Sequence, residues 1–196
     1  LVEAARADFA VQLQDGVAAR SLAQARHHAG PFRLNPTPMS LPVYHYTTGD
    51  RFLRIIASRA ILPATAHVTP PEIPAVWLSS AAVWEPSATK GVIENGIRRQ
   101  ASLAELIGIC GCLVRIEIDP AHVRWLGPSQ FHNVLRIPPG VYDHLIAAGL
   151  EMGADPANWS AVAGPVQLTA FLRIDFTVEA DPLRWIPWPG FRSRVR

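Results

Sequence analysis

Apolar and polar residues alternate along the chain with two different periods, and these periods predict its secondary structure. Within residues 112–118, Leu113, Arg115 and Glu117 alternate with Val114, Ile116 and Ile118, which predicts a half-buried strand. Apolar residues within 52–60 recur at helical spacing instead, directly after a Thr-Thr-Gly-Asp turn. From Leu41 onward we therefore expect a domain of short strands and helices.

Further elements follow from the same periods and from the turn residues between them. Short strands are predicted at 43–46, 75–79 and 166–176 (the last as one strand or a pair), with a closing segment at 183–188. Short helices are predicted at 142–149 and at 102–107, the latter opened by a capping box of Ser102 and Glu105. Strands outnumber helices and do not alternate with them regularly, so we expect an α+β fold with mainly antiparallel pairing.

Residues 1–38 differ in composition from the rest. They are rich in Ala, Gln and Arg, predict two short helices at 2–13 and 17–28, and end in a proline-rich linker. We therefore expect a helical extension over 1–38 and an α+β domain over 39–196. Two origins stay open: the domain begins at Met39 with an extension before it, or residues 1–38 are the tail of a preceding domain.

Composition narrows the class of protein. Apolar residues make up 49% of the chain and Trp occurs 6 times, which favours a folded domain over a disordered segment. No apolar run approaches the roughly 20 residues of a membrane span, and no signal peptide is visible. Cys110 and Cys112 imply neither a disulfide framework nor a zinc site. These features predict a soluble cytoplasmic protein with no membrane partner.

Charge and histidine spacing add little. The net charge is +2, and Lys90 is the only lysine among 18 cationic residues. An arginine-rich C-terminus would suit a nucleic-acid backbone, and a solvated tail is the alternative. No carboxylate falls at metal-ligand spacing beside the later histidines, so we expect no metal site.

A first cluster with candidate chemistry is the Tyr-His-Tyr-Thr-Thr sequence at 44–48, where a strand leads into a helix. In a strand, His45 and Thr47 point to one face, while Tyr44 and Tyr46 point to the other. The following helix would present free N–H groups to an anion such as a pyrophosphate. An aromatic ladder around a core histidine is the alternative.

A second cluster spans 75–80 and continues to Trp84 and Glu85. Trp77 and Ser79 share one face of the predicted strand, and the hydroxyls of Ser79 and Ser80 end it where a ligand could be hydrogen-bonded. Trp84 offers a flat surface for stacking. The alternative is a buried tryptophan with capping serines and a solvated glutamate.

Together the two clusters resemble the NAD-dependent ADP-ribosyltransferase fold. The matching features are the His-Thr strand end, a helix with Ile55-Ile56, the Leu62-Pro63 turn and the Trp-x-Ser-Ser strand at 77–80. The arrangement is most similar to the His-type branch, which includes DarT-like DNA ADP-ribosyltransferases and RNA 2′-phosphotransferases. The resemblance covers about residues 41–90 and, more loosely, 165–174, which looks like the closing strand of such domains.

The resemblance implies a split antiparallel sheet, NAD as substrate and a set of site residues. Those expected to contact NAD or line its cleft are His45, Tyr46, Thr47, Trp77, Ser79, Ser80 and Trp84. Many transferases of this fold place a catalytic Glu just before the closing strand, where residues 158–163 of this chain carry no acid. Glu85 is therefore our candidate catalytic acid, beside His45.

Three functions follow as hypotheses. The first is an NAD-dependent ADP-ribosyltransferase or NAD glycohydrolase whose acceptor is nucleic acid, protein or water, in the toxin, phage or defence context that the resemblance implies. The second is a non-catalytic nucleotide-binding module on the same scaffold, which the missing acid favours. The third is an interaction protein that docks a partner through residues 1–38.

Overall fold

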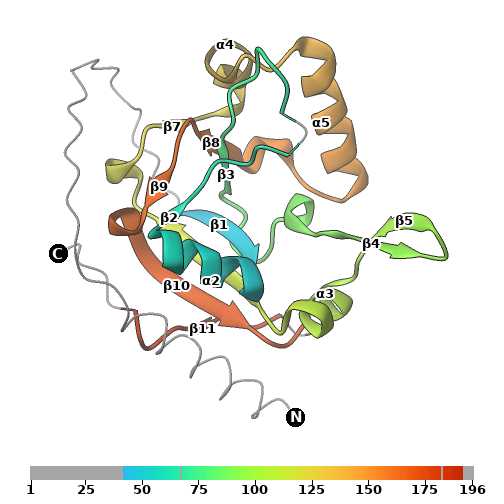
Figure 1. Ribbon diagram of the computed structural model, residues 1–196, viewed down its shortest axis with the longest axis vertical. Coiled ribbons are helices and arrows are strands. Elements are labelled where there is room, and N and C mark those ends of the chain that lie inside the picture. Colours follow the sequence, from blue (N-terminus) through green and yellow to red (C-terminus); the bar gives the residue numbers. More distant parts are fainter. Residues whose placement is uncertain (1–41, 67, 182, 192–196) are drawn as a thin grey trace. The chain divides into compact units, whose positions relative to one another are not determined.

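The computed structural model describes residues 42–66, 68–181 and 183–191, so the predicted extension over 1–38 and the last arginines lie outside the described residues. The main element is a seven-stranded antiparallel sheet with β1 at its centre (Figure 1). Its strands, in spatial order, are β11 (Ile186–Pro187), β10 (Phe171–Thr177), β6 (Leu113–Ile118), β1 (Val43–Thr48), β3 (Val76–Ser79), β8 (Trp159–Val162) and β7 (Trp125–Leu126).

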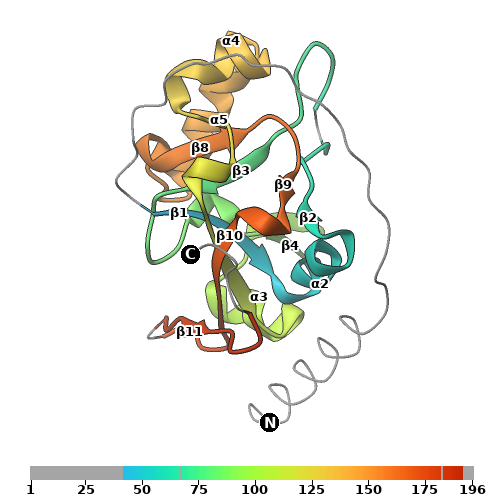
Figure 2. The ribbon, with the colours of Figure 1, turned by 90° about the vertical axis from the view of Figure 1, so that its left-hand side faces the viewer.

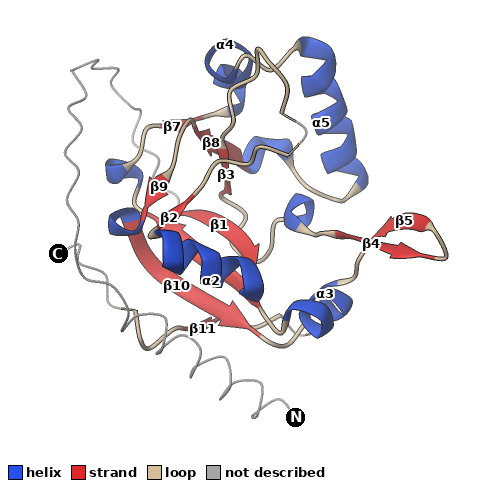
Figure 3. Cartoon of the chain, viewed as in Figure 1, coloured by secondary structure: helices blue, strands red, loops and turns tan. Residues whose placement is uncertain are grey.

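Two small antiparallel pairs and the helices complete the described chain (Figure 3). The pairs are β2 (Ala60–Ile61) with β9 (Val166–Gln167), and β4 (Gly91–Glu94) with β5 (Ile97–Gln100). The α-helices are α2 (Gly49–Ser58), α3 (Leu103–Cys110), α4 (Phe131–Leu135) and α5 (Pro139–Glu151). Short 3-10 turns are η1 (Pro86–Ala88), η2 (Pro120–His122), η3 (Pro128–Gln130), η4 (Pro156–Asn158) and η5 (Leu168–Ala170). The α+β class with antiparallel pairing is confirmed.

The two neighbours of β1 pair with it to very different extents. β6 matches β1 at every position, from Val43 opposite Ile118 to Thr48 opposite Leu113. β3 matches β1 at a single position, Tyr44 opposite Ser79. The sheet therefore opens between β1 and β3 after one pair, and this opening positions the candidate site.

Three of the four described α-helices lie at the ends of the sheet, and α2 lies against its central strands (Figure 1). α4 and α5 lie at one end, α3 and β11 at the other, and the β4–β5 hairpin projects from the body (Figures 1 and 2). α2 packs against β1, β2 and β6. Among the described residues, no helix has both the length and the apolar character needed to cross a membrane.

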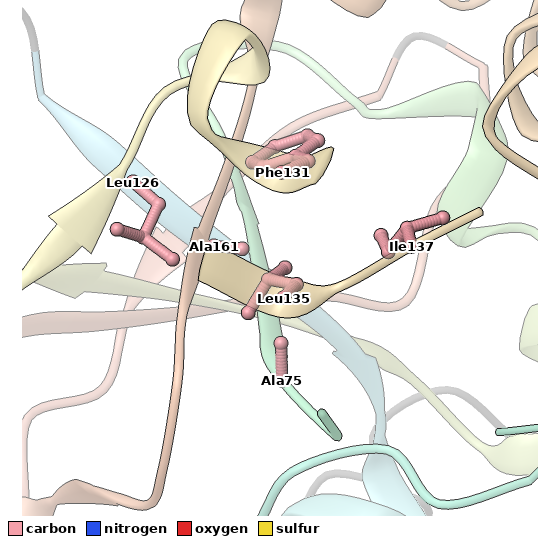
Figure 4. Close-up of a cluster of buried hydrophobic side chains, with 6 residues drawn as sticks. All are labelled: Ala75, Leu126, Phe131, Leu135, Ile137 and Ala161. Carbon is pink, nitrogen blue, oxygen red and sulfur yellow. The ribbon is translucent and has the colours of Figure 1, made fainter. Parts of the chain in front are cut away.

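One buried cluster ties α4 to the outer half of the sheet (Figure 4). It consists of Ala75, Leu126, Phe131, Leu135, Ile137 and Ala161, and Phe131 and Leu135 are fully buried. Trp77 packs on it, with its ring edge-on to that of Phe131 at 5.3 Å between centroids. Closely packed cores hold side chains in single positions, so this cluster fixes the wall of the site beside β3.

Periodicity located the longer elements of the sheet but missed several shorter ones. The predicted strands at 43–46 and 112–118 and the capped helix near 102–107 are present, and Ser102 and Glu105 make both bonds of the capping box. No strand was predicted where β2, β4, β5, β7 and β8 form, and no helix where α4 forms. The hairpin turns through Asn95 and Gly96, both at positive φ, which is the geometry that an Asn-Gly turn favours.

Candidate functional site

A pocket of about 830 Å³ lies at the opening between β1 and β3. Its walls come from β1, α2, the loop at 61–66, β3, the segment at 85–90 and α5, with Trp159 of β8. The predicted site residues that line it are His45, Tyr46, Thr47, Trp77, Ser79 and Glu85. Pockets that bind small molecules and cofactors have volumes of roughly 300–1,000 Å³, so this pocket is large enough for a dinucleotide.

His45 extends from β1 across the opening and replaces a missing ladder bond. Its Nδ1 lies 3.0 Å from the carbonyl oxygen of Trp77. Because a carbonyl only accepts, Nδ1 carries the proton and Nε2 keeps its lone pair. Burial, assisted by the nearby charges of Lys90 and Arg51, lowers the pKa of His45 to about 4. The imidazole is therefore neutral at pH 7 and offers a hydrogen-bond acceptor.

Glu85 is a buried carboxylate on the other side of the pocket. Its Oε1 accepts three hydrogen bonds, from the amide and hydroxyl of Ser87 (3.2 and 2.7 Å) and from Nε1 of Trp159 (3.2 Å). Its Oε2 accepts one, from the hydroxyl of Ser79 at 2.6 Å. A carboxylate has about four acceptor positions, two on each oxygen. Oε2 is therefore the oxygen with room for a ligand hydroxyl.

The local sequence explains why Glu85 stays in this orientation. Glu85 is the N-cap of η1, and Pro86 begins that turn. The bond from the Ser87 amide satisfies a backbone N–H that the turn leaves free. Ser79, at the end of β3, also accepts a bond from the Ala81 amide at 3.1 Å, so its hydroxyl proton is directed to Glu85.

Positive charge predominates over negative charge in the pocket. Its lining contains Arg51, Arg54 and Lys90, whereas Glu85 is its one carboxylate. Burial and the neighbouring Arg51 lower the pKa of Lys90. Within the part of the chain that the structure describes, no residue forms an ion pair with Lys90. A half-buried cation without a counterion favours binding of an anion.

Tyr46, Thr47 and Trp77 form walls. Thr47 is buried. The hydroxyl of Tyr46 donates to the carbonyl of Ala81, and burial raises its pKa far above the usual value. Trp77 accepts the His45 bond through its backbone, while its ring packs into the cluster around Phe131. These three residues shape the pocket, and His45 and Glu85 contribute an imidazole and a carboxylate to its lining.

Two predicted site residues, Ser80 and Trp84, lie outside the pocket lining. The hydroxyl of Ser80 donates to Oδ1 of Asn158 at 2.9 Å and helps to anchor the turn before β8. Trp84 donates from its indole nitrogen to the hydroxyl of Thr89 at 3.0 Å, and its ring packs on Tyr46. The chain turns away from the pocket after Ser79, so these side chains stabilise the loop instead.

Sequence reasoning missed several polar residues of the pocket, among them Arg51, Arg54, Lys90 and Trp159. Arg51 and Arg54 are three residues apart in α2, which places them on one face. Lys90 had a signal, because it is the only lysine of an arginine-rich chain. Trp159 had none: it lies in the stretch noted for its missing acid, and only the fold brings it to Glu85.

No protein-family model, curated protein or solved structure matches this chain. The resemblance to ADP-ribosyltransferases thus stays a prediction, and the pocket itself has to support any function. Among the described residues, no group of three or more His, Cys, Asp or Glu side chains is arranged to hold a metal ion.

Proposed function

We propose that the pocket binds NAD and cleaves the bond between nicotinamide and ribose, as an ADP-ribosyltransferase-like enzyme. The observation that carries the proposal is that His45 and Glu85, far apart in sequence, line one dinucleotide-sized pocket at the opening of the sheet. An antiparallel sheet that separates after one pair between β1 and β3 also supports the split-sheet fold of that class.

Each polar group has a role in this reaction. The C1′–N bond breaks, its electron pair leaves with nicotinamide, and positive charge develops on the ribose. Oε2 of Glu85, held by the Ser79 hydroxyl, stabilises that charge. Through its lone pair, Nε2 of His45 accepts a hydrogen bond from a ribose hydroxyl. An acceptor oxygen, from water, protein or nucleic acid, then attacks C1′ and releases its proton.

The cations account for the rest of the ligand. Lys90 and the Arg51–Arg54 pair lie beside His45 and Glu85 in the same lining. A pyrophosphate supplies the negative charge that this part of the pocket lacks, and arginine forks bind its oxygens through two parallel hydrogen bonds. We therefore expect ADP-ribose to bind even though it lacks the nicotinamide group.

The test is release of nicotinamide from NAD, measured with water as acceptor and then with added DNA, RNA or protein. We expect Glu85→Gln to lower the rate by about 100-fold to 1,000-fold and His45→Ala by about 10-fold to 100-fold. The matched controls are Glu151→Gln and His144→Ala, both exposed and outside the pocket lining, which should keep the wild-type rate. Equal rates in Glu85→Gln and wild type would contradict the assigned role of Glu85.

One observation favours a second candidate, a nucleotide-binding module without turnover. Glu85 already accepts four hydrogen bonds from its own chain, which is also what a purely structural carboxylate does. Calorimetry with ADP-ribose separates the two candidates. Binding of ADP-ribose and NAD with no nicotinamide released in the presence of any acceptor identifies the module.

A further inference from the structure

Gly149 in α5 lies against one particular side chain. It is buried in the pocket lining, and a Cβ built on it would lie 2.4 Å from both Cζ2 and Cη2 of the Trp159 indole. Gly140 of the same helix has no atom within 4 Å of its Cβ position. A glycine weakens a helix relative to alanine. At Gly149, unlike at Gly140, that weakening has a packing reason.

The indole that lies against Gly149 also contacts Glu85. Nε1 of Trp159 donates to Oε1 of Glu85 at 3.2 Å, and the ring atoms nearest Gly149 lie on the same side of the indole as Nε1. A displacement of the ring away from α5 therefore moves the N–H as well. Trp159 is thus the link between a helix and the candidate acid.

The other bonds to Glu85 are local in sequence. Ser87 and Ser79 are two and six residues away, whereas Trp159 is 74 residues away. α5 also packs against η1, the turn that carries Ser87. Among the bonds that the Glu85 carboxylate accepts from described residues, the one from Trp159 is therefore the one that comes from a distant part of the chain, the first residue of β8.

We infer that Gly149 is a positioning residue: its missing Cβ lets Trp159 lie against α5, where the indole N–H holds the Glu85 carboxylate at the pocket. The effect on turnover rests on the proposed function, but the geometry does not. Alanine at 149 would push the ring outward, because backbone and indole have no free space between them.

The first measurement needs no substrate. Protein labelled with nitrogen-15 tryptophan gives one indole N–H resonance for each of the 6 tryptophans, and the Trp159 resonance is the one missing from Trp159→Phe. Gly149→Ala is expected to shift this resonance and to speed exchange of its proton with water, and Gly140→Ala to change neither. A Trp159 resonance identical in Gly149→Ala and wild type overturns the inference.

A double-mutant cycle tests the inference even if Gly149→Ala folds poorly. Gly149→Ala is expected to lower the urea midpoint of the wild-type protein and to have a far smaller effect when combined with Trp159→Phe, which removes the clashing ring atoms. If Gly149→Ala does not fold and its combination with Trp159→Phe does, this outcome supports the inference in the same way. An equal loss in both backgrounds overturns the inference.

Turnover then connects the geometry to the reaction. Small misplacement of a catalytic group lowers rates by up to about 100-fold. We expect Gly149→Ala and Trp159→Phe to lower kcat for nicotinamide release by about 10-fold with KM nearly unchanged, and Gly140→Ala to match wild type. If the wild-type protein releases no nicotinamide, the proposed function is wrong, while the Trp159 resonance and the double-mutant cycle still test the role of Gly149. If the wild-type protein turns over NAD and Gly149→Ala does so at the same rate, the inference about Gly149 is wrong and the proposed function stands.

Discussion

Each flank of β1 has a half-buried cation, and the two cations differ in whether a carboxylate neutralises them. Toward β6, the guanidinium of Arg115 lies 2.7 Å from the buried carboxylate of Asp175. Its Cζ also lies 4.7 Å from the centroid of the Tyr44 ring and 4.9 Å from that of the Trp185 ring. Toward β3, Lys90 forms no ion pair with any residue that the structure describes. A neutralised cation completes the fold, whereas an unneutralised one leaves a place for a ligand.

Strand pairing differs in the same direction. β6 pairs with β1 along its whole length, so Arg115 lies among strands and finds a partner there, Asp175 of β10. β3 pairs with β1 once, and His45 and the pocket occupy the space beyond. Extensive strand pairing is thus concentrated on one flank and the pocket on the other. This contrast can be tested from both sides.

The largest expected effect is on the paired flank. Asp175→Asn leaves Arg115 half-buried without its counterion, and breaking a buried pair in this way lowers the free energy of unfolding by about 3–5 kcal/mol. Urea denaturation followed by circular dichroism measures it. Arg173 also contacts Asp175 but is exposed, so Arg173→Gln is the control, with a loss below about 1 kcal/mol. Equal losses in the two variants would contradict a special role for the buried pair.

Next in size is the pH dependence that comes from His45. Its pKa is 6.5 in an unfolded chain and about 4 in the folded protein. Between these values the unfolded state binds more protons, so the free energy of unfolding decreases as the pH falls from 6.5 to 4, by up to about 3 kcal/mol. Denaturation of wild type and His45→Gln across this range isolates the histidine. A difference between the two proteins that stays constant with pH would contradict the buried neutral imidazole.

The smallest effect on stability concerns Lys90. Lys90→Met keeps the length of the side chain and removes a charge whose pKa burial already lowers. We expect the unliganded protein to gain about 1 kcal/mol in unfolding free energy and to bind ADP-ribose at least about 10-fold more weakly. Calorimetry measures the affinity and urea denaturation the stability. The exposed Arg124, which lies outside the pocket lining, gives the comparison: Arg124→Gln should weaken binding by less than about 3-fold, because it does not line the pocket and water screens its charge. Lower stability in Lys90→Met would mean that Lys90 has a structural partner.

Local patterns predicted β6 and α3 correctly because the signals for both elements come from residues close together in sequence. Alternation over 112–118 and the capping box of Ser102 and Glu105 are interactions between near neighbours in sequence. β8 was missed because its first residues turn toward other elements: Trp159 packs on α5, and Ser160 is buried. No single periodicity describes a strand whose contacts come from elsewhere in the chain.

The candidate site shows the same division. The residue types at His45 and Glu85 were recognisable from the sequence, together with a strand end that leads into a helix. The sequence could not show that the two share a pocket, that Ser80 and Trp84 lie outside it, or that Lys90 and Trp159 belong to it. Those facts depend on where β1 and β3 separate and on how α5 packs.

By itself, then, the sequence determined the α+β class and the central strands, and it pointed to His45 and Glu85 as candidate residues, because these signals come from residues close together in sequence. The tertiary structure decided the environment of each group: a neutral His45, a Glu85 held by Trp159, and a Lys90 without a counterion. The reason is physical. Protonation, orientation and charge balance are set by burial and by partners that are distant in sequence, and only folding brings those together.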